Sequence, residues 1–116
     1  MLSNSVINNM MFKYCPQSKE ELRDAIEEVA KKTTSRVLDL SEIDTSLITD
    51  MSLLFKLLNI NYNNFIYEIK FDRWDTSNVT DMNQMFYGCE QLKELDLTPF
   101  DTSNVKKMSS MFNGCV

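Results

Sequence analysis

Hydrophobic and polar residues alternate along three short stretches of the chain. These stretches are LDLSEI at 38–43, IKFDRW at 69–74 and LDLTPF at 95–100. Strict alternation is typical of an extended chain with one side buried and the other in water. The pattern therefore predicts three short strands. It also predicts an apolar stack of the three residues that end the stretches, Ile43, Trp74 and Phe100.

A second apolar pattern follows each strand at a spacing typical of a short helix. In the middle stretch Val79, Met82, Met85 and Phe86 would share one helix face. The corresponding residues elsewhere are Ile48, Met51, Leu54 and Phe55, and Val105, Met108, Met111 and Phe112. An Asp-Thr-Ser sequence precedes each pattern and offers side-chain oxygens that can cap a helix. Each stretch is thus expected to continue as strand, turn, helix and turn, with the methionines as core residues.

The patterns recur because the sequence itself is repeated. DTSNVTDMNQMFYGC at 75–89 returns as DTSNVKKMSSMFNGC at 101–115, with ten of fifteen positions identical. A looser copy begins at Asp44. Self-similarity of this kind indicates a repeat architecture. We call the three copies the first, second and third units, which begin at Leu38, Ile69 and Leu95 and are offset by 31 and 26 residues.

Two details of the units lead to further expectations. Gly88 and Gly114 follow the predicted helices, where glycine adopts a left-handed turn without a steric penalty. The first unit lacks the Gly-Cys pair and is five residues longer, so residues 56–64 are expected to form a longer helix end and an asparagine-rich loop.

The N-terminal part predicts one amphipathic helix. Pro16 interrupts the preceding segment, and Ser18 and Glu21 have the spacing of a capping box. Apolar residues then recur at helical spacing, which predicts a helix over 19–32. We expect residues 1–36 to be a tail and capping helix, and residues 37–116 to be a three-repeat solenoid within one domain.

The repeated strings resemble a known family. LDLTPFDTSNVKKMSSMFNGC and WDTSNVTDMNQMFYGCEQLKELDL are similar to the BspA-like leucine-rich repeats of bacterial surface proteins and lipoproteins. The resemblance covers residues 36–116, and Pro16–Ala30 matches the helical lead-in that often precedes such repeats. It implies an α/β fold, a short right-handed leucine-rich-repeat-like solenoid with parallel strands, three repeats and an N-terminal capping helix. It also implies a cell-surface or secreted location and adhesion to host proteins or other cells.

Charge and hydropathy exclude several classes of partner. The net charge of −5 and the pI near 4.6 argue against nucleic acid or an anionic membrane. No apolar run reaches the length of about 18 residues that a membrane helix needs. The first fifteen residues also lack the basic and continuous apolar segments of a secretory signal. The sequence therefore leaves the compartment undecided.

Residue types that carry common chemistry are sparse. The chain has no histidine, which removes the commonest general base and zinc ligand. Its three cysteines, Cys15, Cys89 and Cys115, are an odd number and predict free thiols, unless the chain reaches an oxidising compartment where Cys89 and Cys115 can pair. The row of Asp44, Asp75 and Asp101 is better explained by turns than by calcium. We expect no catalytic residue, no metal and no cofactor.

The outward side of the predicted strands is the candidate binding surface. Its partner-binding residues would be Asp39, Glu68, Lys70, Asp72, Glu94 and Asp96. Stacked parallel strands would place Lys70 between Asp39 and Asp96 at about 4.8 Å per step. Arg36, Tyr67 and Lys93 are expected to face the core side, unless the strands fray at this end. The surface is either a solvated face with weak charge pairs or a mildly acidic docking site.

Two functional hypotheses follow. The first is a non-enzymatic protein-protein interaction module, an adhesin-like leucine-rich-repeat fragment. The alternative is a small acidic intracellular inhibitor or effector that binds a basic surface of a partner protein. The partner would be a protein of unknown identity. Because the chain stops at Val116 without a polar closing element, we also expect the uncapped C-terminal coil either to fray or to associate with another copy of the chain.

Overall fold

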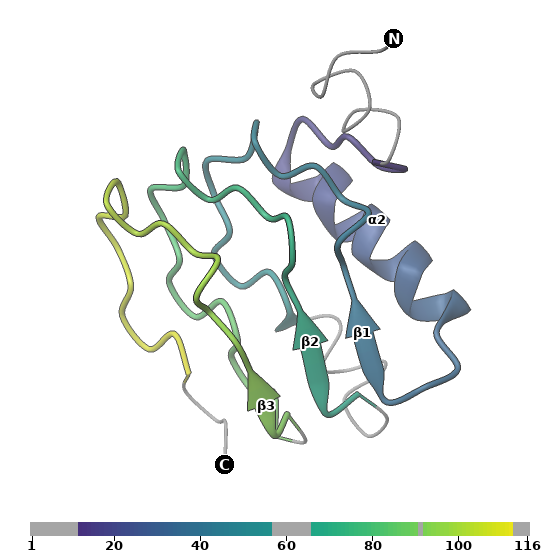
Figure 1. The fold of residues 1–116 in the computed structure, drawn as a ribbon. Coiled ribbons are helices and arrows are strands. Elements are labelled where there is room, and N and C mark those ends of the chain that lie inside the picture. The colour runs from purple at the N-terminus through teal and green to yellow at the C-terminus, as the bar shows by residue number, and fades with distance from the viewer. Residues whose placement is uncertain (1–11, 57–65, 91, 113–116) are drawn as a thin grey trace, which may run out of the picture.

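The computed structural model describes residues 12–56, 66–90 and 92–112, which form a small α/β domain. Its elements are α2 (Lys19–Lys32), β1 (Val37–Asp39), β2 (Glu68–Lys70) and β3 (Glu94–Leu95). The strands form one parallel sheet in the order β1-β2-β3. Helix α2 lies beside β1, so the elements succeed one another from helix to β3 (Figure 1). The sheet is open at the β3 edge.

Helix α2 has the bounds that the sequence predicts. The Ser18 hydroxyl accepts a hydrogen bond from the Glu21 amide at 3.2 Å, as a helix N-cap does. The Glu21 carboxylate accepts from the Gln17 amide at 3.0 Å instead of returning to Ser18, so the reciprocal capping box is wrong. The buried face of α2 consists of Leu22, Ala25, Ile26 and Ala30. This face covers the first unit.

The strand register reproduces the sequence repeat. Leu38 is paired with Ile69, and Ile69 with Leu95, so the offsets of 31 and 26 residues become direct neighbours in the sheet. A second parallel ladder joins the return segments of the units. The Met51 amide donates to the Asp81 carbonyl at 2.9 Å, and the Met82 amide donates to the Lys107 carbonyl at 2.8 Å. Equivalent residues of neighbouring units therefore lie side by side both in the sheet and in the second ladder.

The helix predicted within each unit is wrong. The residues after each Asp-Thr-Ser form turns and the second ladder. Some amides close short turns within the unit, as Val79 does to the Thr76 carbonyl at 3.0 Å, and others bond to a neighbouring unit, as Met82 does to Lys107, so no continuous helix forms. Leu53, Gln84 and Ser110, which are equivalent positions, have φ values of 55°, 54° and 54°. This left-handed residue changes the chain direction between two inward methionines, and Met82 and Met85 are both fully buried.

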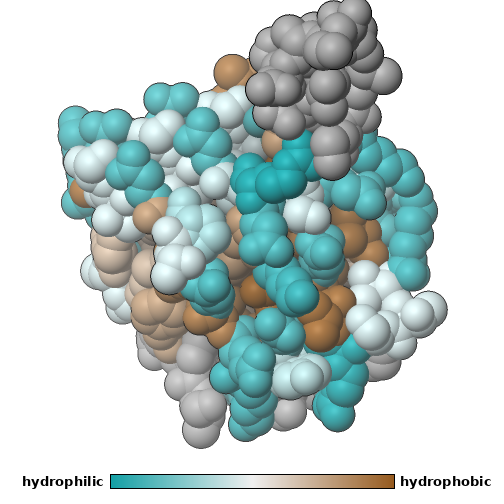
Figure 2. All heavy atoms as spheres, in the orientation of Figure 1, coloured by the Kyte–Doolittle hydropathy of each residue, from teal (hydrophilic) through white to brown (hydrophobic). Residues whose placement is uncertain are grey.

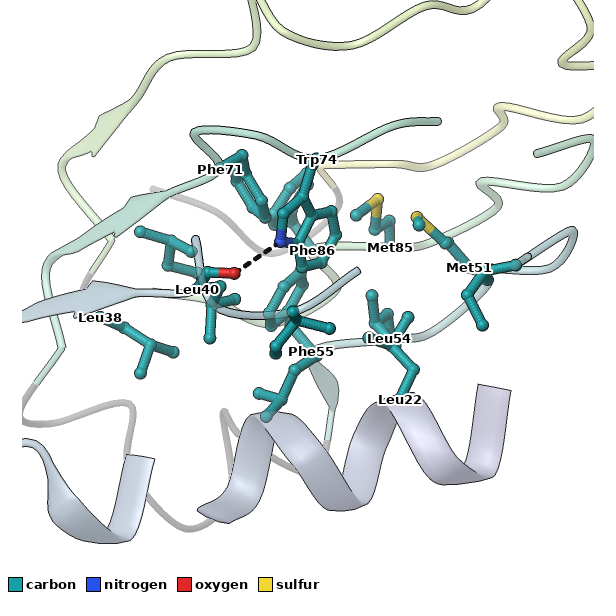
Figure 3. Packing of buried hydrophobic residues seen from close by; sticks show 14 of the residues in the cluster. Leu22, Leu38, Leu40, Met51, Leu54, Phe55, Phe71, Trp74, Met85 and Phe86 are labelled. Atoms are coloured by element: carbon teal, nitrogen blue, oxygen red, sulfur yellow. Dashed lines mark hydrogen bonds between the residues drawn. The ribbon is translucent and has the colours of Figure 1, made fainter. Parts of the chain in front are cut away.

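The predicted core positions are confirmed in the first two units. The seven predicted positions of each unit are buried: Leu38, Leu40, Ile43, Ile48, Met51, Leu54 and Phe55, and Ile69, Phe71, Trp74, Val79, Met82, Met85 and Phe86. Figure 3 shows members of this core together with Leu22 of α2. Trp74 is 4% exposed and stacks on Phe100 with ring centroids 6.3 Å apart, as predicted.

Several smaller expectations have mixed outcomes. Gly88 has the predicted left-handed conformation, with φ 74°. Cys89 is buried and Cys15 is exposed. Gly114, Cys115 and residues 57–64 lie outside the described residues. Within the described ranges, no helix has the length and apolar character required to span a membrane.

Candidate interaction surface on the outer face of the sheet

The sheet brings together the polar residues that the sequence selects. Glu68 pairs with Val37 and with Glu94, and Lys70 pairs with Asp39. One step beyond β3, the same register places Asp96 beside Lys70. Side chains of Asp39, Lys70, Asp72, Glu94 and Asp96 are exposed, and that of Glu68 is half-buried. The six candidate residues thus occupy one face, opposite the buried Leu38 and Ile69.

Hydrogen bonds hold two of these carboxylates in place. Asp39 accepts from the Ser41 amide and Asp96 from the Thr98 amide, each at 3.0 Å. The Thr98 amide, and then its hydroxyl, hold the pKa of Asp96 below its ordinary value. These bonds orient both carboxylates at the strand ends, and the lowered pKa favours the ionised form of Asp96.

Lys70 interrupts this acidic row. Within residues 12–56, 66–90 and 92–112, the ion pairs are Lys19–Asp50 and Glu28–Lys32, so Lys70 forms none with Asp39. An exposed ammonium beside oriented carboxylates remains available to a ligand, because weak surface pairing leaves little to displace. The face presents opposite charges at fixed intervals.

Arg36, Tyr67 and Lys93 lie at the end of the sheet, as the second of the two expectations for them has it. They precede the first paired residue of each strand, and none of them is buried. The Arg36 guanidinium lies over the Tyr67 ring, 5.7 Å from its centroid. The Tyr67 amide donates to the Arg36 carbonyl at 2.9 Å and the Lys93 amide to the Tyr67 carbonyl at 2.7 Å, so this column forms the border of the sheet. The surface carries two further cations and is less acidic than its six candidate residues alone.

The Asp-Thr-Ser corners have a structural role. Asp44, Asp75 and Asp101 each accept a hydrogen bond at 3.0 Å from the amide two residues later. The Ser103 hydroxyl, and then its amide, lower the pKa of Asp101. These bonds form side-chain turns, which replace the predicted helix caps. The described residues contain no group of three or more potential metal ligands among Cys, Asp and Glu.

Sequence reasoning missed the threonines of the same corners. The buried Thr45 hydroxyl donates to the Asp75 carbonyl at 3.0 Å and accepts from the Asp75 amide at 2.9 Å. Thr76 does the same to Asp101 at 3.1 and 2.8 Å. The available signal was the presence of threonine at one position in all three units.

The fold and its polar face define a small α/β protein with stacked sequence units and no assembled catalytic group among the described residues. Residues 20–116 match the family model described as Mycoplasma protein of unknown function, DUF285. Since this match spans most of the chain, the protein belongs to that family. Searches among curated proteins and among solved structures found no match.

Proposed function

We propose that the protein is a non-enzymatic protein-protein interaction module, built as a short leucine-rich-repeat solenoid of the BspA-like kind. The supporting features are the repeated strings, the parallel register of the three units and the two hydrogen-bonded ladders. A stack of this type presents an extended face whose side chains are positioned by the backbone repeat. The proposed role of this face is to recognise a partner protein.

The observation that carries the proposal is the alternation of charges on the outer face. Lys70 lies opposite Asp39, and Glu68 lies opposite Glu94, with Arg36 and Lys93 at one border. Such a face suits a protein partner with a complementary pattern of both charges, since charge complementarity sets register and specificity. In the adhesin-like role implied by the family resemblance, this partner is a protein of the host or of another cell.

The acidic-inhibitor alternative receives less support. Its argument is the net charge of −5, which favours a basic partner surface. The exposed cations at Arg36, Lys70 and Lys93 oppose a purely acidic mimic, because they would face the cations of such a partner.

Charge reversal tests the proposed face. The variant Asp39→Lys, Glu94→Lys, Asp96→Lys should lose at least tenfold in the amount of protein retained from host-cell surface extracts by the immobilised chain. A matched control is Asp24→Lys, Glu27→Lys, Glu28→Lys on α2, which makes the same charge change away from the sheet. Equal retention by the wild type and the sheet variant would contradict the proposal.

A further inference from the structure

Two like charges, those of Glu68 and Glu94, lie side by side on the outer face of the sheet. The two residues are directly paired between β2 and β3, and neighbouring strands lie about 4.8 Å apart. Like charges in direct opposition destabilise a sheet. Among the residues that the structure describes, neither glutamate forms an ion pair. The fold thus retains an unfavourable pair of carboxylates that a cation from a partner would stabilise.

The surroundings of this pair fit an arginine side chain. A guanidinium carries several N–H donors in a rigid plane, so it can bridge two carboxylates, whereas the ammonium of lysine is a compact point charge. Val37 is half-buried and lies directly opposite Glu68 on β1. It offers an apolar contact to the methylene groups of an arginine, which long cationic side chains bury while their charged end stays polar. The row of Val37, Glu68 and Glu94 therefore has contacts for both parts of an arginine.

Lys70 limits what can accompany that arginine. It lies two residues after Glu68 on β2, on the same face and about 6.6 Å further along the strand. Its ammonium is exposed, and within the described part of the chain it forms no ion pair. A second cation of the partner would meet a like charge here, whereas a carboxylate would be attracted. An arginine followed by an acidic residue therefore fits this face better than a run of basic residues.

A metal ion is a poorer match for the carboxylate pair. Calcium takes six to eight oxygen ligands, and the described residues contain no group of three or more potential metal ligands. A guanidinium needs only the two carboxylates. The arrangement of charges therefore favours a side chain of a partner protein over an inorganic cation.

We propose that the outer face binds an extended segment of a partner protein through one arginine and one acidic residue. The arginine guanidinium bridges the Glu68 and Glu94 carboxylates, and the acidic residue pairs with Lys70. One residue separates the two in the partner, because alternate side chains of an extended segment lie on one side about 6.6 Å apart. Figure 2 shows hydrophilic residues over the strands of the sheet, where this segment lies. The inference rests on the function proposed above and names the chemistry of the partner.

A capped peptide of sequence Gly-Ser-Arg-Thr-Glu-Ser-Gly is the probe, titrated into the isotope-labelled full chain and followed by NMR. Saturable shifts are expected at the amides of β2 and β3. A peptide with lysine in place of arginine should bind about fivefold more weakly, because it cannot bridge both carboxylates. A peptide with a second arginine in place of glutamate should also bind about fivefold more weakly, because this arginine meets Lys70.

Variants of the chain test the same contacts from the other side. Glu68→Gln, Glu94→Gln removes both charges with little change of shape and should weaken peptide binding about tenfold. The matched control Glu27→Gln, Glu28→Gln removes two neighbouring charges from α2 and should bind the peptide as the wild type does. Lys70→Gln should bind the peptide with two arginines at least as tightly as the original peptide. Circular dichroism verifies that all variants retain the fold.

Several results would overturn the proposal. They are the absence of saturable shifts, equal affinity of the wild type for the original peptide and for either altered peptide, and equal affinity of the wild type and Glu68→Gln, Glu94→Gln. The retention experiment with host-cell surface extracts separates this failure from that of the proposed function. Retention that is lost in the triple lysine variant of the sheet but unchanged in Glu68→Gln, Glu94→Gln would overturn the arginine site alone. Retention that neither variant changes would contradict both.

Discussion

The indole Nε1 of Trp74 donates a hydrogen bond to the carbonyl oxygen of Leu40 at 2.9 Å (Figure 3). This bond joins the corner of the second unit to the strand end of the first. The same indole lies parallel to Phe100 of the third unit, with 2° between the ring planes. One buried side chain therefore contacts all three units.

Truncation of Trp74 should destabilise the fold strongly. Trp74→Ala should lower the free energy of unfolding by about 3–5 kcal/mol, as large-to-small core substitutions do. Trp74→Phe keeps most of the packing but removes the indole hydrogen bond, and the Leu40 carbonyl still accepts from the Ile43 amide at 3.2 Å, so a smaller loss of about 0.5–1.5 kcal/mol is expected. Urea denaturation measures both. Wild-type emission should be blue-shifted and poorly quenched by iodide, and emission like that of free tryptophan would contradict the burial.

The three corner threonines form an internal series. Thr45→Val and Thr76→Val should each cost about 1–3 kcal/mol, because an aspartate amide and carbonyl lose their buried partner. Thr102→Val at the exposed equivalent should change stability by less than about 0.5 kcal/mol. Denaturation midpoints of the three variants test the series. Equal losses at all three positions would show that the hydroxyl bridges do not stabilise the stack.

The sequence predicted correctly which residues of the first two units are buried. It did not predict the backbone conformation that buries them. Repeat alignment identified the core positions and the strand register, because a side chain in a stack must match its neighbours in the adjacent units. The segment from Val79 to Phe86 was read as a helix since its apolar spacing fits one. The left-handed Gln84 places the same residues inward on a different backbone, and side-chain spacing alone does not distinguish the two.

The candidate face was predicted in outline. Alternation placed Asp39, Lys70 and Glu94 on the outer side, and the sheet confirms their placement while their binding role stays a prediction. The sequence left open whether Arg36 and Lys93 face the core or lie beyond the strands, and in the structure both precede the first paired residues and are exposed. The extent of a short strand depends on where its hydrogen-bonded neighbours begin, which a single strand's sequence does not contain.

The left-handed position offers a test of backbone strain. Ser110 is exposed and has φ 54°, a conformation that costs a residue with a Cβ about 1–2 kcal/mol. Glycine avoids this strain but loses more backbone entropy on folding than serine does. The net effect of Ser110→Gly should therefore be a stabilisation of about 0.5–1 kcal/mol. Ser110→Val, with a branched Cβ, should destabilise it. Thermal unfolding compares the two variants, and an ordering with valine above glycine would contradict this conformation.

The contact between α2 and the first unit should weaken in acid. The Lys19 ammonium lies 3.2 Å from the Asp50 carboxylate and also donates to Ser52. Partial burial raises the pKa of Asp50, but hydrogen bonds from Ser52 and the charge of Lys19 outweigh it, so the pKa is lowered overall. Because the pKa of Asp50 is lower in the folded protein, its carboxylate stabilises the fold at pH values above the unfolded pKa near 3.9. This stabilisation is lost as the pH falls through the pKa of the folded state.

Asp50→Asn should therefore lower the free energy of unfolding by about 0.5 kcal/mol at pH 7, a value reduced for solvent exposure of the pair. The difference between wild type and variant should vanish near pH 2. Urea titrations at both pH values measure it. Glu28→Gln removes the exposed partner of Lys32 and serves as the control, with a smaller effect at either pH. A deficit in Asp50→Asn that persists at low pH would assign it to packing.

The unequal spacing of the units has an evolutionary consequence. The first and second units are offset by 31 residues and the second and third by 26, yet both ladders keep the same register across each step. Phe55 is equivalent to Phe86 and Tyr67 to Lys93, so the additional residues of the first unit fall in the sequence between Phe55 and Tyr67. Because doubling a loop costs only about 0.6 kcal/mol of closure entropy, insertions and deletions here are nearly neutral for folding. This connection is where descendants of the gene can diversify in length and sequence while inheriting an unchanged core.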